Sequence, residues 1–352
     1  MANARVVLIA GASGAAATRI AERAAAEPGF EAVGLSRRVP EGAGAWIAAD
    51  LQDPDGLARA LSERPGISHV VYASRAPHAE SGVEDVDANV AMLRNLVDAA
   101  EASLPRFAHL HVVQGGKWYG MHIGPYRTPA REDDPRHMPP NFYYDQQDMV
   151  AERQRRGGGW VWTASRPAFV LDVAPGRARN MVSTLGAYAA LCRELSLPFD
   201  FPGKPGAWTA LQEVTDAALL AQGVLWMLAE PRCANRAFNM NNGDCFRWRD
   251  LWPHLAALFG LRPGAVRTMK LAEWMADKGP VWERIRARHG LRLPLDAVAS
   301  WPFADFFLGL EHDVLSSMAA ARGAGFTGSV DTWAMFGAQV EGYRAARVLP
   351  PA

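Results

Sequence analysis

Apolar and polar positions alternate with two periods along the first half of the chain. Short apolar runs typical of strands occupy residues 5–11, 30–36, 45–50, 69–74, 107–116 and 160–167. Patterns typical of helices occupy residues 15–27, 57–63 and 83–103. Strands that alternate with helices predict βαβ units and a parallel sheet, so we expect an α/β fold.

A glycine-rich turn follows the first strand-like run in the segment LIAGASGAAA. Gly11 and Gly14 stand between that run and an alanine-rich helix, and Ala17 takes the third position of the spacing. Glycines there let the backbone approach a pyrophosphate, whose charge suits the helix amino terminus. An ordinary glycine turn has the same spacing, but the order strand, turn, helix favours a Rossmann-like doubly wound sheet.

The end of the second strand-like run favours NADP over NAD. The segment GLSRR places Ser36, Arg37 and Arg38 where NAD-dependent folds often present an acidic residue to the ribose. Guanidinium groups match a phosphate better than a diol, although a solvated basic loop would have the same sequence. Asp50 and Leu51 end the third run, where a carboxylate can accept from the adenine amine.

Beyond Pro167 the alternation becomes irregular, and tryptophans and prolines become frequent. We expect this half to supply a smaller, mostly helical cap that binds substrate. The expected NADP-binding Rossmann domain covers residues 1–170 and 207–245, and the expected cap covers residues 171–206 and 246–352.

Composition limits the partners. The 37 basic side chains balance 37 acidic ones, so no net field favours nucleic acid or an anionic membrane. Three cysteines show no metal-like spacing and no disulfide framework, so we expect no metal site and a reducing compartment. Without a leader-like segment or eighteen uninterrupted apolar residues, the expected location is the cytoplasm. The expected partner is a small molecule.

Two tyrosines stand side by side in the segment NFYYDQQD, at residues 141–148. In many short-chain dehydrogenases a lysine follows the catalytic tyrosine by four residues, so one helical turn brings the ammonium beneath the phenol. Gln147 and Asp148 occupy these positions after Tyr143 and Tyr144. The usual lysine is therefore missing.

The nearest lysine before the tyrosines is Lys117, in the segment VVQGGKWYG. It is the only lysine among the first 200 residues of a chain that otherwise uses arginine. Its retention suggests that a compact ammonium is needed at this position.

The segments GASGAAA, SRR, DL, GGKWYG, PPNFYYDQQD, SRPAFV and AFNMNNGDCFRWRDLW occur in this order along the chain. With VWERIRARHGL and SMAAARGAGFTG near the carboxyl end, they resemble the progesterone 5β-reductase and iridoid synthase-like family of extended short-chain dehydrogenases. The resemblance implies that Lys117 and Tyr143 are the catalytic pair and that Tyr144 packs or orients. The residues expected to contact NADPH or NADP⁺ are Gly11, Ser13, Gly14, Ala15, Ser36, Arg37, Arg38, Asp50, Leu51, Ser74, Lys117, Tyr143 and Val170.

Three positions depart from the plant members of that family. Trp118 and Gln147 stand where plant members have histidine and glutamate, and Arg75 matches a tryptophan near the expected substrate pocket. The resemblance therefore implies the hydride chemistry, but not the steroid or iridoid substrates.

The implied activity is NADPH-dependent reduction of the carbon–carbon double bond of an α,β-unsaturated carbonyl compound. Hydride adds to the β-carbon, and Tyr143, supported by Lys117, donates a hydrogen bond to the enolate oxygen. Carbonyl reduction to an alcohol and a non-catalytic NADP-sensing role are the alternatives. The expected substrate is a small hydrophobic enone or carbonyl compound, and a homodimer is part of the expectation.

Overall fold

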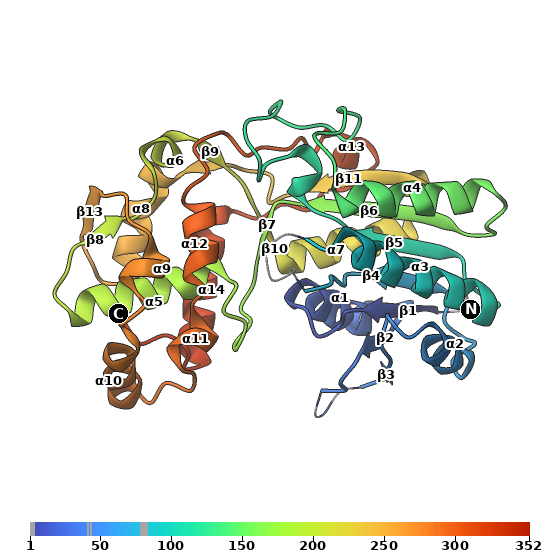
Figure 1. Cartoon of the computed structure of the whole chain (residues 1–352), viewed down its shortest axis with the longest axis horizontal. Helices are drawn as coiled ribbons and strands as arrows, with labels where there is room; N and C mark the ends of the chain where they lie inside the picture. Colours follow the sequence, from blue (N-terminus) through green and yellow to red (C-terminus); the bar gives the residue numbers. More distant parts are fainter. Residues whose placement is uncertain (1–3, 41, 43, 78–83) are drawn as a thin grey trace.

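The computed structural model describes residues 4–40, 42, 44–77 and 84–352. A parallel sheet with helices on both faces forms one half of the molecule, and a mostly helical cap lies beside it (Figure 1). The amino terminus lies in the sheet half and the carboxyl terminus in the cap (Figure 1).

The main sheet runs in the order β11-β6-β5-β4-β1-β2-β3, and all its neighbouring strands are parallel. Its strands are β1 (Arg5–Ala10), β2 (Phe30–Ser36), β3 (Trp46–Ala48), β4 (His69–Tyr72), β5 (His109–Val113), β6 (Val161–Pro167) and β11 (Arg236–Met240). The strand order reverses between β1 and β4, where doubly wound sheets bind ligands beyond the strands' carboxyl ends. The expected Rossmann-like α/β fold is confirmed.

Helices cover both faces of this sheet. One face packs against α1 (Ala15–Ala26), α7 (Ala217–Ala229) and α13 (Ala319–Gly323). The other packs against α2 (Pro54–Ser62), α3 (Val86–Ser103) and α4 (Phe142–Arg155). Two short 3₁₀ helices are η1 (Gly116–Tyr119) and η2 (Pro231–Cys233).

Short polar side chains fix where several helices begin. Asp53, Asp85 and Asp216 each accept a hydrogen bond from a backbone N–H in the first turn of α2, α3 and α7. Such caps satisfy N–H groups that have no partner inside the helix. Helix α3 begins at Val86, three residues after the helical sequence pattern predicts, and α2 begins at Pro54, three residues before its pattern.

The cap encloses a separate aromatic core. Its helices are α5 (Met181–Glu194), α6 (Pro205–Thr209), α8 (Trp248–Leu258), α9 (Leu271–Trp274), α10 (Gly279–His289), α11 (Leu295–Val298), α12 (Trp301–Phe307) and α14 (Thr332–Ala345). Its short strands are β8 (Phe199–Phe201), β9 (Leu211–Gln212), β12 (Phe246–Arg247) and β13 (Pro263–Val266). Trp248, Trp252 and Trp282 are fully buried in this core, and the Trp252 indole N–H donates to the Phe199 carbonyl.

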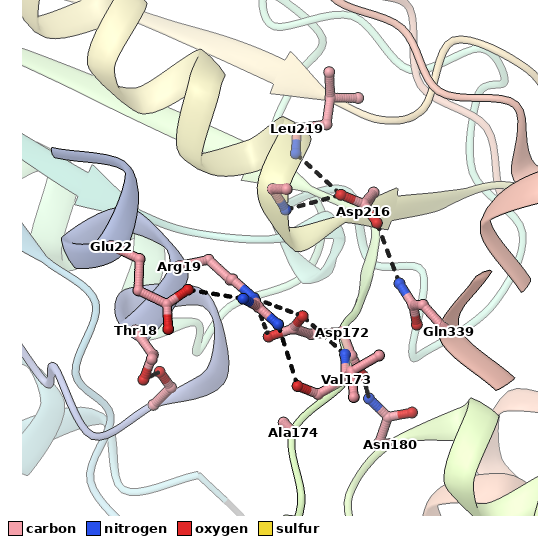
Figure 2. A network of polar contacts seen from close by, with 12 residues as sticks. Thr18, Arg19, Glu22, Asp172, Val173, Ala174, Asn180, Asp216, Leu219 and Gln339 are labelled. Atoms are coloured by element: carbon pink, nitrogen blue, oxygen red, sulfur yellow. Dashed lines mark hydrogen bonds and ion pairs between the residues drawn. The ribbon is translucent and has the colours of Figure 1, made fainter. Parts of the chain in front are cut away.

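The two halves meet at the parallel pair β7 (Phe169–Leu171) and β10 (Val214–Asp216). Arg19, from α1, donates to both carboxylate oxygens of Asp172, at 2.8 and 3.0 Å (Figure 2). Asn180 donates to the Asp172 carbonyl, and Gln339 of α14 donates to Asp216. These contacts tie the cap to α1, which follows the glycine turn, and to the start of α7.

The packing crosses the domain boundaries expected from sequence. Helix α13 lies in the segment assigned to the cap, yet Ala321 packs in the core of the sheet half. Helix α6 begins before residue 207 and packs against α8 of the cap, so Ala207 belongs to the cap's core. The division at residues 170, 207 and 245 stays a prediction. In the described ranges, no helix is both long and apolar enough to cross a membrane.

Candidate active site

The backbone of the glycine turn leaves no room for a side chain at Gly11. Gly11 has a φ of +83°, and a Cβ there would lie 2.6 Å from Ser74 Oγ and 2.9 Å from the Ala73 carbonyl oxygen. Only glycine adopts this conformation readily at such a close approach. Gly14 then precedes α1, and the turn is closed by its N–H bond to the Gly11 carbonyl.

A cleft of about 670 Å³ opens at the carboxyl ends of β1, β2 and β4. This volume lies in the usual range for small-molecule sites. It is lined by most of the residues expected to contact the cofactor: Gly11, Ser13, Gly14, Ser36, Arg37, Arg38, Asp50, Leu51 and Ser74. Ala15 is the first residue of α1, directly beside this cleft.

Arg37 and Arg38 are exposed at the rim of the cleft. Neither guanidinium makes a hydrogen bond or ion pair with the described residues, whereas the Ser36 hydroxyl donates to the Arg38 carbonyl. Two cations without partners beside a nucleotide-sized cleft fit a phosphate. The glycine turn, the open amino end of α1 and this pair therefore suit the phosphates of a nicotinamide dinucleotide.

Lys117 and Gly11 lie at the same edge of the sheet, because each follows the carboxyl end of a parallel strand. Lys117 is in η1, and its Nζ lies 2.8 Å from Glu84 Oε1, which also lies 3.2 Å from Arg75 Nη1. Glu84 is not among the site residues expected from the sequence. Its position directly before the Asp85 cap of α3 would have placed it near this edge.

Asn141 connects the lysine loop to the tyrosine helix. Its Oδ1 accepts from the Tyr143 N–H at the start of α4, and its Nδ2 donates to the Lys117 carbonyl at 2.9 Å. One amide therefore fixes the relative position of η1 and Tyr143. Asn141 is not among the site residues expected from the sequence, although asparagine ahead of a helical segment is a common cap.

The Tyr143 hydroxyl lies against the backbone that leaves β5 and β6. A Cβ at Gly115 would be 3.3 Å from Tyr143 Oη and 3.7 Å from the Pro167 carbonyl oxygen. Burial raises the pKa of Tyr143 to about 12, and the charge of Glu84 adds to this. The charges of Arg75 and Arg179 act in the opposite direction. At neutral pH the side chain is thus a protonated phenol that can donate a hydrogen bond.

Tyr144 has a different environment. Its hydroxyl donates to the Trp118 carbonyl at 2.6 Å and accepts from the His137 N–H at 2.9 Å. Its ring packs edge-on against Trp118, and the residue is buried. Both hydrogen-bonding functions of this phenol are used inside the protein.

Gln147, four residues after Tyr143, belongs to a buried polar network. Its Oε1 accepts from Arg166 Nη2 and from Gln114 Nε2. The Arg166 guanidinium also stacks on Trp118, 3.6 Å from the ring centroid. Because the Gln147 side chain accepts a hydrogen bond from Arg166, this position serves the packing of the buried polar network.

Within the described residues, no hydrogen bond joins Lys117 to Tyr143, and neither lines the cleft beside the glycine turn. Val170 lies in β7, opposite Thr215 of β10, where the chain passes from one half to the other. The roles assigned to these three residues stay predictions.

Comparison with known proteins identifies similar chains. A family model described as a PRISE-like Rossmann-fold domain matches residues 61–350. An (S)-8-oxocitronellyl enol synthase from Camptotheca acuminata is 33% identical over 319 residues, which cover 87% of this chain and 80% of the relative. A 3-oxo-Δ(4,5)-steroid 5β-reductase from Arabidopsis thaliana is 32% identical over 320 residues, with the same coverage.

Solved structures share the fold at low sequence identity. A short-chain dehydrogenase/reductase superfamily protein from Agrobacterium tumefaciens with bound NAD superposes with a TM-score of 0.69 at 16% identity. The superposition covers 98% of this chain and 98% of that one. At this identity the likeness supports the fold alone.

Proposed function

The chain belongs to the PRISE-like Rossmann-fold family, and we propose that it is an NADPH-dependent reductase of α,β-unsaturated carbonyl compounds. The observation that carries the proposal is the protonated Tyr143 phenol at the carboxyl edge of the sheet, beside Gly115 and Pro167. The relative named as a steroid 5β-reductase supports this reaction class. A cytoplasmic location is part of the proposal.

When bound, NADPH supplies the hydride that adds to the β-carbon of the enone. Gly11, Gly14 and the amino end of α1 would hold its pyrophosphate, and Arg37 and Arg38 would hold its 2′-phosphate. Their lack of other partners in the described part of the chain favours NADPH over NADH.

Tyr143 donates a hydrogen bond to the carbonyl oxygen of the substrate, where negative charge develops as the β-carbon is reduced. Its pKa near 12 keeps the proton on the phenol until that charge appears. A donor positioned in advance stabilises this charge more than the neutral ground state. Lys117, on the loop that Asn141 ties to α4, adds positive charge at the same edge.

Incubation of the protein with NADPH and a panel of small enones tests the proposal. Loss of nicotinamide absorbance, with a saturated ketone identified as product, is the expected result. An alcohol with the double bond retained would show carbonyl reduction instead. Tight NADPH binding without turnover of any enone or carbonyl compound would show a non-catalytic protein.

A further inference from the structure

Arg179 lies in the segment that joins β7 to α5, and the backbone around it is held firmly. The next residue, Asn180, caps α5 through Oδ1 and donates from Nδ2 to the Asp172 carbonyl at 2.7 Å. Asp172 in turn binds Arg19 of α1 (Figure 2). Because these hydrogen bonds hold the segment, the backbone from which the Arg179 side chain extends is fixed in place.

The Arg179 side chain lies over the ring of Phe303, which is close to Phe169 on the chain that leaves the tyrosine site. Its guanidinium carbon is 5.1 Å from the ring centroid of Phe303, a half-buried residue of α12. Phe303 lies 6.2 Å from the ring of Phe169, which follows Pro167 by two residues. The Pro167 carbonyl is beside the space at Gly115 that the Tyr143 hydroxyl approaches.

Arg179 and Tyr143 also influence one another electrostatically. Arg179 is among the charges that oppose the burial-raised pKa of Tyr143, together with Arg75. Partial burial and the charge of Arg75 lower the pKa of Arg179 itself, while Glu84 and Tyr143 act in the opposite direction. An arginine stays protonated under such a shift, so Arg179 is a cation at the site.

Within the described part of the chain, Arg179 makes no hydrogen bond and no ion pair, and its guanidinium lies over the Phe303 ring. Arg19, which contacts the same segment, is paired with Asp172. Lys117 and Arg75 share Glu84. Arg179 therefore differs from Arg19, Lys117 and Arg75 in having its five donors available. Arg177, which is exposed in the same loop, has no such ring contact among the described residues, whereas Arg179 lies over the Phe303 ring.

We propose that Arg179 receives an anionic group of the substrate, so that the preferred substrates are enones whose apolar skeleton carries a carboxylate. The proposal rests on the proposed reductase function. The guanidinium fork pairs with a carboxylate through two parallel hydrogen bonds. Phe303, which is half-buried, offers apolar surface to the skeleton while Tyr143 receives the carbonyl oxygen.

The test uses a cyclohexenone that carries a short alkyl carboxylate and the methyl ester of the same compound. Arg179→Met keeps the length of the side chain and removes its charge, and Arg179→Lys keeps the charge without the fork. Arg177→Met is the matched control, because Arg177 is exposed in the same loop and has no side-chain partner among the described residues. Thermal melting verifies that each variant is folded.

The unaltered protein should show a higher kcat/KM for the carboxylate than for the ester. Arg179→Met should lower kcat/KM for the carboxylate by about 10- to 100-fold, the range for hydrogen bonds to charged groups, and leave the ester nearly unchanged. Arg179→Lys should fall between the two, and Arg177→Met should match the unaltered protein. Added salt should reduce the preference for the carboxylate.

Other outcomes overturn the proposal. Equal losses on acid and ester would contradict an anion receptor, and a weaker NADPH dissociation constant in Arg179→Met would assign Arg179 to the cofactor. If neither compound is reduced, the proposed function fails. Calorimetric binding of the carboxylate to the NADP⁺ complex then tests the inference alone. A dissociation constant raised by about tenfold or more in Arg179→Met supports it, and an equal dissociation constant contradicts it.

Discussion

The Nζ atom of Lys117 lies 2.8 Å from Oε1 of Glu84, the residue that precedes the cap of α3. The same oxygen lies 3.2 Å from Arg75. Glu84 thus holds the ammonium at the edge of the site, and its charge also raises the pKa of Tyr143. Lys117 can support the phenol during reduction only if its ammonium leaves Glu84 or interacts with both groups.

Lys117→Met and Glu84→Gln should therefore have different effects. Lys117→Met should weaken NADPH binding and lower turnover, because it removes the positive charge that we propose supports the phenol and contacts the cofactor. Glu84→Gln removes a partly exposed ion pair and should alter kcat by less than about fivefold. Steady-state kinetics and NADPH titration measure both, and equal losses in the two variants would show that Glu84 itself is required.

Tyr143→Phe should lower kcat for enone reduction by about 100-fold or more while NADPH binding is retained, because only the donor hydroxyl is lost. Tyr144→Phe is the matched control. It removes the bonds to the Trp118 carbonyl and the His137 N–H, so it should lower the free energy of unfolding by about 1–3 kcal/mol and affect kcat far less. Retention of most activity by Tyr143→Phe would assign the donor to another group.

Replacing both Arg37 and Arg38 by alanine should raise KM for NADPH and scarcely alter KM for NADH. The two guanidinium groups lie at the rim of the cleft beyond β2, where a 2′-phosphate would meet them. Initial rates with each cofactor provide the measurement. Equal use of NADPH and NADH by the unaltered protein would contradict the assignment.

The ion pair between Arg19 and Asp172 should stabilise the contact between the two halves. Asp172→Asn should lower the free energy of unfolding by about 1–3 kcal/mol, because the Arg19 guanidinium loses a charged partner at both oxygens. Arg23→Met on the same helix is the control, since its exposed pair with Glu27 should contribute less than about 1 kcal/mol. Thermal or urea unfolding compares them, and equal effects would argue against a structural role for the buried pair.

Buried histidines should make the fold sensitive to acid. Burial lowers the pKa of His69 to about 4 and those of His109 and His111 to about 3, and Thr163 Oγ1 lies 2.9 Å from His109 Nε2 and 2.8 Å from His111 Nδ1. Because these pKa values lie below the unfolded value near 6.5, the unfolded chain binds more protons in acid. Stability should therefore be complete above about pH 6.5 and fall progressively as the pH approaches 3.

Urea unfolding at several pH values measures this loss. His109→Gln keeps a polar group toward Thr163 and should reduce the slope of stability against pH by up to about 1.4 kcal/mol per pH unit. Identical slopes for the unaltered protein and His109→Gln would contradict the role of His109.

The sequence by itself determined the sheet half of this protein. The strand-like runs and the glycine turn predicted β1, α1 and the parallel order because side-chain period and glycine spacing are local properties. The same local reasoning placed Arg37, Arg38 and Asp50 at strand ends, and these residues do line one cleft. The order of the motifs also identified the family, since a string of motifs along the whole chain is specific.

Only the tertiary structure decided how distant segments meet. Three contacts join residues that are far apart in sequence: Glu84 with Lys117, Asn141 with the Lys117 carbonyl, and Arg19 with Asp172. These residues meet because parallel strands bring their carboxyl ends to one edge of the sheet. The return of α13 to the sheet depends on apolar surface left open beside β11, which no local pattern encodes. Whether an arginine is paired depends on these long-range contacts, so Arg179 could be distinguished from Arg19 only in three dimensions.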